Sequence, residues 1–420
     1  MFCQGIRMGQ QYSSLELISD PEFWIQYIEH KKASFPDNPR IPRYEKLLKK
    51  KSFIELMSQI CEGKYVFSIP EKKLVSKTKV GKKRTVYSFG EQEMMALRII
   101  AYSLYHYDPY LSDCLYSFRS SHIVKEAILR IRYTSVKKRC YGLKIDIHNY
   151  FNSIPVDRFL PMLKNVLQDD PVYSLIEGIL CQRQVLFRDE VIEENKGVMA
   201  GIPLSPFCAN LYLSDMDKFF ETQNCTYLRY ADDILILSDS SETIVDLKCM
   251  LEKWIRDKEL KLNPKKVKMF NPGDPIEFLG FSISDGDIDI SDISVYKLKR
   301  RIRRSARAIR RWMLKNNAPL EGTLKALIRR YNRKFYGYEE SEISWGRWFF
   351  PIITTDRSLH EIDLYFQDWL RFVGTGRHTK KNYDTVPYEI MKRCGYVPLV
   401  SEYHRRKDNI NNQKVESRTD

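Results

Sequence analysis

The sequence predicts an α+β protein in which a mixed body of helices and strands is followed by a bundle of helices. Between residues 141 and 285, short apolar strand-like runs alternate with helical stretches, which predicts the mixed body. Beyond it, apolar residues recur at spacings of three and four, which predicts helices alone. The chain has 420 residues and 43% apolar content, enough for two or three domains with buried cores.

Before residue 141 the pattern predicts helices around a single β-hairpin. Two β-rich runs flank a polar turn rich in lysine, and this predicts a hairpin whose tip carries Lys77 and Lys79. A Pro-rich break separates the first two helical stretches. The predicted elements are helices at 14–35, 44–62 and 91–132, the last interrupted around 108–120, and strands at 64–70 and 84–89.

The central body is predicted from four strand-like runs, YGLKIDI, TYLRYA, DILILS and IEFLGFSIS. Helical patterns at 157–168, 205–221 and 241–259 separate them. Downstream, a stripe of apolar residues predicts a helix whose other faces are almost wholly Arg and Lys. The stripe consists of Leu298, Ile302, Ala306, Ile309 and Met313. Two further stripes, at 320–335 and 359–373, predict a bundle of about three helices.

The positive charge is concentrated in one segment. The whole chain carries a net charge of +15, and residues 297–335 hold fifteen basic residues against one acidic residue, Glu321. This segment therefore accounts for +14 and predicts an extended anionic partner, with nucleic acid as the first candidate. The nine cysteines form no C-x-x-C pair, and no long apolar run occurs, so a cytoplasmic protein with no membrane span is expected.

Carboxylates lie at one end of each of three apolar runs. Asp232 and Asp233 lie between TYLR and ILIL, and Asp146 follows YGLKI. Anions at the ends of buried strands repel one another and lose solvation, an arrangement that normally persists only with bound cations. We expect these strand ends to converge on two Mg²⁺ ions that serve nucleotidyl transfer, with Mn²⁺ able to substitute. The predicted metal ligands are Asp146, Ile147, Asp232 and Asp233.

Four motifs occur in a diagnostic order: D-x-x-x-x-F from Asp146 to Phe151, GIPLSPFCANLYL at 201–213, the YADD sequence at 230–233 and FLG at 278–280. With them the chain resembles bacterial reverse transcriptases of the group II intron-like lineage, and most of all the free-standing, defence-associated enzymes of the unknown groups. The resemblance implies a right-hand polymerase with fingers, a palm built on an antiparallel sheet, and a helical thumb bundle.

The resemblance also divides the chain into predicted domains. These are a helical N-terminal extension (1–62), fingers (63–140), a palm (141–290) with a fingers insert within 157–200, a basic start of the thumb (291–335), a helical C-terminal part of the thumb (336–402) and a flexible tail (403–420).

By the same resemblance, Asp146, Asp232 and Asp233 are the catalytic aspartates and Phe151 is a gate against the ribose 2′-OH. A core aromatic is the alternative for Phe151. The implied nucleotide-binding residues are Lys77, Lys79, Arg84, Phe151, Ala200, Gly201 and Lys266. Either Lys77 or Lys79 joins Arg84 on the triphosphate, unless the hairpin tip is merely solvated, and Lys265 or Lys268 could replace Lys266.

The remaining predicted contacts are with nucleic acid. Arg119, in the YSFR segment, is a template-side contact, and Phe278, Leu279 and Gly280 form a primer grip. The cationic helix tracks duplex phosphates without reading sequence, although a solvated face of the bundle is the alternative. Its contact residues are Lys299, Arg300, Arg303, Arg304, Arg307, Arg310 and Arg311.

One position departs from the family pattern. Where the family usually has P-Q-G, this chain has Met199-Ala200-Gly201, so template handling and fidelity are expected to differ. No Cys or His cluster of a zinc-associated nuclease follows the thumb, no room is left for an RNase H domain, and two retron signatures are missing. A mobile intron protein and a retron enzyme are therefore disfavoured.

The leading interpretation is an RNA-directed DNA polymerase that copies a cognate, structured non-coding RNA with dNTPs into DNA, in bacterial anti-phage defence. The alternatives are a maturase-type RNA-binding factor and template-independent or protein-primed DNA synthesis. The sequence leaves the RNA, the priming mode and the oligomeric state open.

Overall fold

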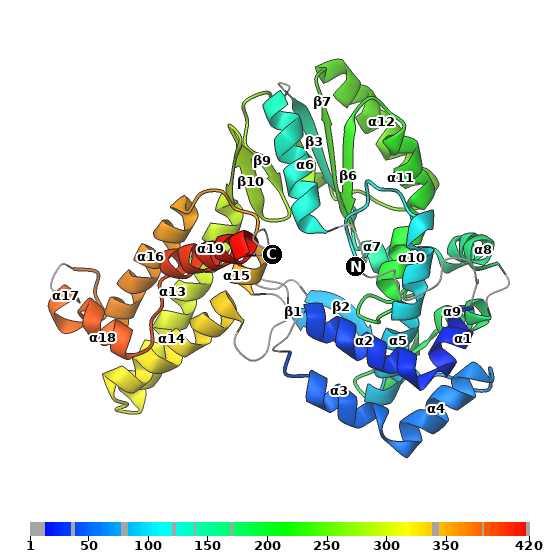
Figure 1. Ribbon diagram of the computed structural model, residues 1–420, viewed down its shortest axis with the longest axis horizontal. Helices are drawn as coiled ribbons and strands as arrows, with labels where there is room; N and C mark the ends of the chain where they lie inside the picture. Colours follow the sequence, from blue (N-terminus) through cyan, green and yellow to red (C-terminus); the bar gives the residue numbers. More distant parts are fainter. Residues whose placement is uncertain are drawn as a thin grey trace. The chain divides into compact units, whose positions relative to one another are not determined.

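The computed structural model describes residues 13–34, 38–76, 83–119, 123–137, 140–168, 171–337, 344–379 and 382–416. Lys77 and Lys79 lie outside these residues. The chain divides into two compact units: residues 1–36 with 40–273, and residues 37–39 with 274–420. Helices share the first unit with a mixed sheet and an antiparallel sheet, and helices dominate the second (Figure 1). The predicted α+β fold class is confirmed.

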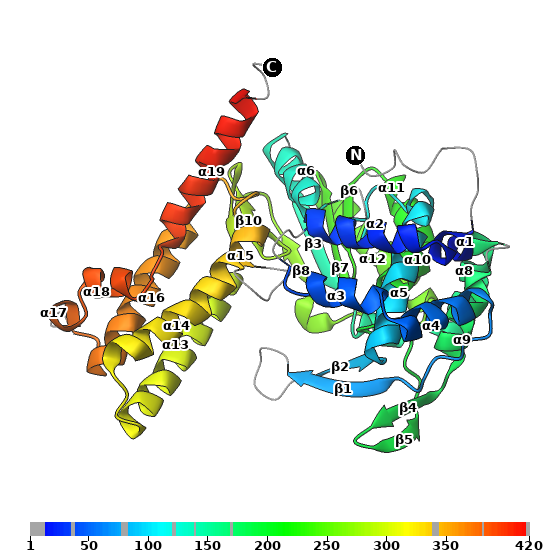
Figure 2. The same cartoon turned by 60° about the horizontal axis from the view of Figure 1, so that its bottom comes forward.

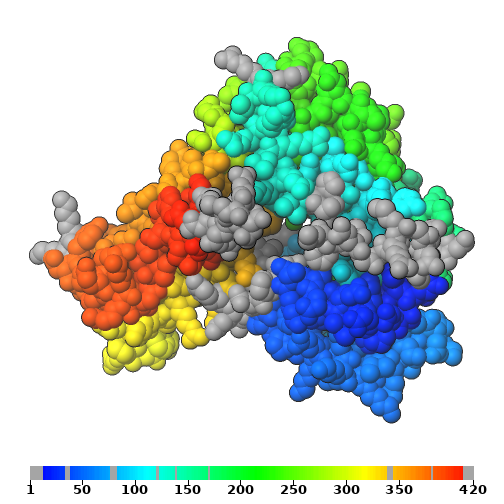
Figure 3. Space-filling view, viewed as in Figure 1, coloured from blue at the N-terminus to red at the C-terminus, as the bar shows by residue number. Residues whose placement is uncertain are grey.

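The first unit opens with four helices, of which α1, α2 and α4 pack on α5 while α3 packs on α2 and α4; they form the blue surface in Figure 3. The four helices are α1 (Ser14–Ser19), α2 (Pro21–Ser34), α3 (Ile41–Leu48) and α4 (Lys51–Cys61). The next helices along the chain are α5 (Glu91–Ser103), the 3-10 helix η1 (Leu104–Tyr110) and α6 (Val124–Lys137). The helix predicted at 14–35 is broken, because Asp20 has extended backbone angles and Pro21 begins a new helix. The indole of buried Trp24 then donates to the Ile18 carbonyl across this break at 2.7 Å.

A four-stranded sheet lies in the predicted fingers, in the order β2-β1-β4-β5. Its strands are β1 (Glu71–Ser76), β2 (Lys83–Ser88), β4 (Gln184–Phe187) and β5 (Glu190–Glu193). The hairpin exists, but the prediction of its first strand at 64–70 was wrong. Ser68 donates to the Glu93 carboxylate instead, and Pro70 has no N–H to give to a ladder. Because β4 pairs with β1 (Figure 2), the insert and the hairpin belong to one sheet.

The second sheet of this unit is antiparallel and has the order β6-β7-β3-β8. Its strands are β3 (Tyr141–Asp146), β6 (Thr226–Tyr230), β7 (Asp233–Ser238) and β8 (Lys268–Phe270). Helix α12 packs on β3 and β7, and α6 and α11 pack on β6 (Figure 1). The helices of this region are α7 (Tyr150–Ser153), α8 (Val156–Leu167), α9 (Val172–Cys181), α10 (Ser205–Tyr212), α11 (Ser214–Glu221), α12 (Ser241–Asp257) and the 3-10 helix η2 (Pro264–Lys266).

The second unit joins a small antiparallel sheet to a helical bundle. The strands are β9 (Ile276–Phe278), β10 (Phe281–Ser284) and β11 (Asp287–Ile290). The helices are α13 (Asp292–Lys315), α14 (Leu320–Tyr336), α15 (Trp345–Trp348), α16 (Arg357–Thr375), α17 (Asn382–Thr385), α18 (Tyr388–Arg393) and α19 (Leu399–Glu416). The boundary between units, at Gly273, assigns these strands to the bundle, whereas the sequence placed them in the palm.

The expected apolar stripes form the core of this bundle. Along α13, Leu298, Ile302, Ala306 and Met313 are buried, and α13 packs against α14 and α16. The segment from residue 403 was predicted to be frayed, but it is helical as far as Glu416. Buried Tyr403 donates to the Ile353 carbonyl, and Glu402 holds two arginines of the same helix. Among the described residues, no helix combines the length and the apolar character that a membrane crossing needs.

Candidate active site and nucleic-acid interface

Two neighbouring strands bring the predicted catalytic aspartates to one end of the antiparallel sheet. In the β3–β7 ladder Asp146 lies directly opposite Asp233, and Tyr230 of β6 is the other partner of Asp233. The Ile147 amide donates to the Asp232 carbonyl at 3.0 Å, which extends the pairing past the strand ends. The convergence expected from the sequence therefore occurs in the backbone.

The turn between β6 and β7 is strained and is held from outside. Ala231 is buried and has φ +53°, a left-handed conformation that is uncommon for a residue with a Cβ. Its amide donates to the Ser117 hydroxyl at 2.9 Å, and that hydroxyl donates to the Asn210 side chain at 3.1 Å. The side-chain amide of Asn210 in turn donates to the Ser117 carbonyl at 2.7 Å. Segments far apart in sequence thus fix the turn that carries Asp232 and Asp233.

A buried ion pair lies beneath this turn. The Arg229 side chain has no exposed area, and its Nε donates to Asp217 at 2.7 Å. The Tyr227 hydroxyl donates to the same carboxylate at 2.7 Å. Burial first, and then the Asp217 charge, raises the pKa of Tyr227 well above its usual value, so the phenol stays a donor.

The remaining donors of Arg229 reach the backbone of the site. Its guanidinium donates to the carbonyls of Asn210, at 3.0 Å, and Ala231, at 3.2 Å. No pattern in the sequence predicts this network, since an Arg in a strand normally reaches solvent.

Electrostatics at the strand ends fit a cation site. Burial first, and then the negative charges of Asp146 and Asp233, raises the pKa of Asp232 from 3.8 to about 6. Such a shift is the expected cost of placing carboxylates together in a partly buried location. Protons and a divalent cation therefore compete for Asp232.

Asp146 already has partners inside the protein. Its carboxylate forms an ion pair with Lys266 of η2 and accepts from the Asn263 side chain at 3.2 Å. The Asn263 amide also donates to the Asp146 carbonyl at 2.8 Å. The structure thus places Lys266 at the aspartates. The sequence did not single out Asn263.

The oxygen-rich set suits a hard cation. Mg²⁺ is commonly held by one or two carboxylates together with substrate phosphates and water, and Asp146 and Asp232 offer such carboxylates on adjacent strands. Within the described ranges no three His, Cys, Asp or Glu side chains are placed as a ready metal cluster. Lys266 supplies the compensating charge at Asp146, and a cation bound there would replace it.

Phe151 follows β3 and is half-buried at the edge of the site. The backbone around it is fixed: its carbonyl accepts from the Val198 amide at 2.9 Å. A Cβ on Gly197 would meet that carbonyl at 2.5 Å, so only glycine fits at this point. Ring contacts join Phe151 to Tyr150 at 5.7 Å and to Phe118 at 6.3 Å between centroids.

The Met199-Ala200-Gly201 segment connects Asn152, the residue after Phe151, to the fingers sheet. The Ala200 amide donates to the Asn152 side chain and its carbonyl accepts from Tyr87 of β2, both at 2.8 Å. Gly201 has φ +111°, and a Cβ there would meet the Tyr87 carbonyl at 2.7 Å. The buried Ala200 side chain serves packing, while exposed Gly201 stays available as a backbone contact.

Two further predicted contact residues, Arg84 and Arg119, have no hydrogen bond to the three predicted catalytic aspartates among the described residues. Arg84 is exposed on β2, paired in register with Val75. The Arg119 guanidinium is used within its own loop, where it donates to the carbonyls of Ser112 at 2.6 Å and Asp108 at 3.0 Å. Its predicted contact with the template stays a prediction.

Phe278, Leu279 and Gly280 form the tight hairpin between β9 and β10 in the second unit. Leu279 and Gly280 both have positive φ, as the two-residue turn requires. The Trp348 indole donates to the Leu279 carbonyl at 3.2 Å, and Phe278 is fully buried. The turn is therefore rigid within its own unit, and its role as a primer grip stays a prediction.

The basic residues of α13 divide into two groups. Lys299 forms an ion pair with Glu361, Arg310 donates to the Val373 carbonyl at 2.6 Å, and Arg307 lies over the Trp369 ring at 5.6 Å. These three contact α16. The other four predicted contact residues are exposed, and they are Arg300, Arg303, Arg304 and Arg311.

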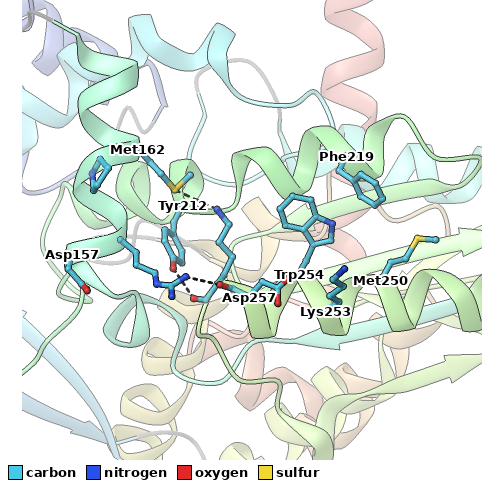
Figure 4. A pocket seen from close by; sticks show the side chains of 11 residues that line it. Asp157, Met162, Tyr212, Phe219, Met250, Lys253, Trp254 and Asp257 are labelled. Carbon is cyan, nitrogen blue, oxygen red and sulfur yellow. Dashed lines mark hydrogen bonds between the residues drawn. The ribbon is translucent and has the colours of Figure 1, made fainter.

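A separate hollow of about 750 Å³ lies between α8, the α10–α11 region and α12 (Figure 4). Phe219 and Trp254 form one wall with ring centroids 5.6 Å apart, and Arg158 donates to the Asp257 carbonyl at 3.1 Å. None of the predicted site residues lines it. The candidate chemistry is thus assigned to the strand ends and not to this hollow.

The strand ends with their three aspartates lie within a segment that matches a known protein family. Residues 75–283 match the family model described as reverse transcriptase (RNA-dependent DNA polymerase). This segment is a reverse transcriptase domain. It contains β2 through β9, all three aspartates and Phe151. The general part of the predicted resemblance is therefore confirmed, while the defence-associated subgroup is not tested by this match.

Two curated relatives share this domain at low identity. The Escherichia coli retron Ec86 reverse transcriptase is 24% identical over 152 residues, which cover 35% of this chain and 44% of the relative. An uncharacterized 91 kDa protein in the cob intron of Schizosaccharomyces pombe is 24% identical over 169 residues, covering 40% of this chain and 20% of that protein. The match thus spans less than half of each relative.

Two solved structures resemble the chain distantly. A C-terminally truncated apo telomerase of Candida tropicalis aligns with a TM-score of 0.44 and 14% identity, over 54% of this chain and 55% of that chain. A partial Cas6-RT-Cas1–Cas2 complex aligns with a TM-score of 0.34 and 20% identity, over 59% and 43%. Neither alignment is close enough to carry an argument about function.

Proposed function

We propose that this protein is an RNA-directed DNA polymerase. The observation that carries the proposal is Asp146 directly opposite Asp233 in a reverse transcriptase domain, with Asp232 electrostatically coupled to both. A bound divalent cation pair would supply Lewis-acid activation of a 3′ hydroxyl and charge compensation at the leaving pyrophosphate. The residues that would hold it are Asp146, Asp232 and Asp233, with the Ile147 carbonyl.

The chain's own groups then perform the positioning. Lys266 neutralises Asp146, and its flexible ammonium group would contact a phosphate oxygen of a bound triphosphate. Phe151 limits the room for a ribose 2′-OH, and Arg84, with Lys77 or Lys79, binds the triphosphate. The Ser117–Asn210 link keeps the aspartate turn in its left-handed geometry, so the site is preorganised.

The finer part of the proposal concerns substrate and setting. We propose a structured non-coding RNA as template, with dNTPs as substrates and DNA as product, in bacterial anti-phage defence. The support is the motif resemblance and the exposed arginines of α13, which suit phosphates. That a relative is named a retron reverse transcriptase is compatible with this setting.

Primer extension tests the proposal. The purified protein with an RNA template, an annealed DNA primer and labelled dNTPs is expected to extend the primer with Mg²⁺ and to stop when EDTA is added. The Asp232→Ala/Asp233→Ala variant should bind the primer-template with unchanged affinity and extend nothing. RNA binding without extension by the wild type would instead favour the maturase-type factor, and extension without any template would favour template-independent synthesis.

The exposed arginines give a second test. Replacing Arg300, Arg303, Arg304 and Arg311 together by Gln should weaken RNA binding and reduce the salt slope by about 0.7 to 0.9 log units for each phosphate that the helix no longer neutralises. The measurement is affinity against salt concentration. The matched control replaces four exposed lysines of the first unit, Lys46, Lys49, Lys50 and Lys51. Equal slopes for the two variants would show that the charge acts non-specifically and would remove α13 from the interface.

A further inference from the structure

Phe118 has an unusual backbone for a bulky residue. Its φ is +53°, and its side chain is 44% exposed although the residues before it are buried. A left-handed conformation outside glycine costs free energy and persists only where the surroundings impose it. Here Ser117 is fixed by its two hydrogen bonds with Asn210, and Arg119 is tied to two carbonyls of its loop. The hydrogen bonds of its two neighbours therefore hold Phe118 in the left-handed conformation, with its side chain partly exposed.

The partly exposed ring of Phe118 joins the two segments of the candidate active site. It meets the Phe151 ring edge-on, with centroids 6.3 Å apart and planes at 80°. It also lies 6.0 Å from the ring of Tyr230, the residue before the strained Ala231. Both distances fall in the range of favourable aromatic pairs. Phe118 is thus the link between the gate residue and the aspartate turn.

The contacts of Phe151 show what this link does. Its backbone is fixed by Val198 and by the close approach of Gly197, but a backbone anchor leaves the ring free to tilt. Tyr150 flanks the ring from within the core at 5.7 Å. On the exposed side, Phe118 is the ring contact that the described residues provide. Removing it opens space into which the Phe151 ring can move.

We propose that Phe118 is a positioning residue for sugar selection. It holds the Phe151 ring against the place of the 2′ carbon of an incoming nucleotide, so that discrimination against a ribonucleoside triphosphate depends on both rings. This inference rests on the proposed polymerase function and deepens it.

Single-nucleotide incorporation separates this role from a structural one. For Phe118→Ala, the ratio of kcat/KM for dNTP to that for the matching rNTP should fall about tenfold, and Phe118→Tyr, which keeps the ring, should restore it. Phe118→Gly should lose the same selectivity while its Tm lies at or above that of Phe118→Ala, since glycine relieves the left-handed strain. Tyr110→Ala is the matched control, because Tyr110 is also 44% exposed but contacts Tyr107.

A double-variant cycle with Phe151→Ala decides the mechanism. If Phe118 acts through Phe151, the Phe118→Ala/Phe151→Ala protein should be no less selective than Phe151→Ala alone. A further tenfold fall in the double variant, or an unchanged ratio in an active Phe118→Ala protein, would overturn the inference and leave the polymerase proposal standing. A wild-type protein that incorporates neither dNTP nor rNTP would overturn the proposed function and this inference with it.

Discussion

Asp146→Asn is expected to lower the rate of dNTP incorporation by about a thousandfold or more. The asparagine keeps the size of the side chain but removes the charge that faces Asp233 across the β3–β7 ladder. Charge stabilisation by a bound cation contributes several kcal/mol to a transition state, and about 4 kcal/mol corresponds to a factor of a thousand. The measurement is single-turnover incorporation at saturating dNTP.

Folding and binding should be retained in this variant. Asn263 can still donate to the new amide oxygen, and the loss of the Lys266 ion pair is modest because the Lys266 side chain is 56% exposed. Asp246→Asn, on the exposed face of α12, is the matched control and should leave the rate within a factor of two. A rate within tenfold of the wild type for Asp146→Asn would exclude Asp146 from catalysis.

The strand ends that carry the three aspartates could be predicted because their signal is local. Apolar runs such as YGLKI and ILIL specify strands through β-propensity and burial, and a carboxylate at the end of such a run is conspicuous. The antiparallel pairing then places Asp146 and Asp233 opposite each other. The apolar stripe along α13 could also be predicted, since a helical period maintained from Leu298 to Met313 defines the face that packs against the other helices.

What supports the site could not be predicted, because it depends on contacts between residues far apart in sequence. Ser117 and Asn210 are 93 residues apart, and Asn263 reaches Asp146 across 117 residues. The sequence shows Arg229 only as a charged residue within a predicted strand. Its burial depends on the counter-charge of Asp217, which the sequence does not place beside it. The first strand of the fingers hairpin was misplaced for the same reason, since Glu93 holds Ser68 from outside.

Asp217→Leu is expected to destabilise the protein by about 3 to 5 kcal/mol, because it leaves the guanidinium of Arg229 buried without a counter-charge. Tyr227 loses its acceptor at the same time. Urea unfolding followed by circular dichroism measures the change. Asp215→Leu, two residues earlier on α11, is the matched control: its carboxylate is 46% exposed and pairs with Lys258, so its loss should cost about 1 kcal/mol or less.

Removing the whole network separates stability from catalysis. The variant Asp217→Leu/Tyr227→Phe/Arg229→Met replaces a buried ion pair with apolar side chains, a change that is often close to neutral, so it should recover more than half of the stability that Asp217→Leu removes. It should not recover polymerisation, because the Ala231 carbonyl then lacks the guanidinium that helps to hold the turn of Asp232 and Asp233. A stable variant with wild-type incorporation would show that the network serves folding alone; a stable variant at least tenfold slower would assign it to preorganisation of the aspartates.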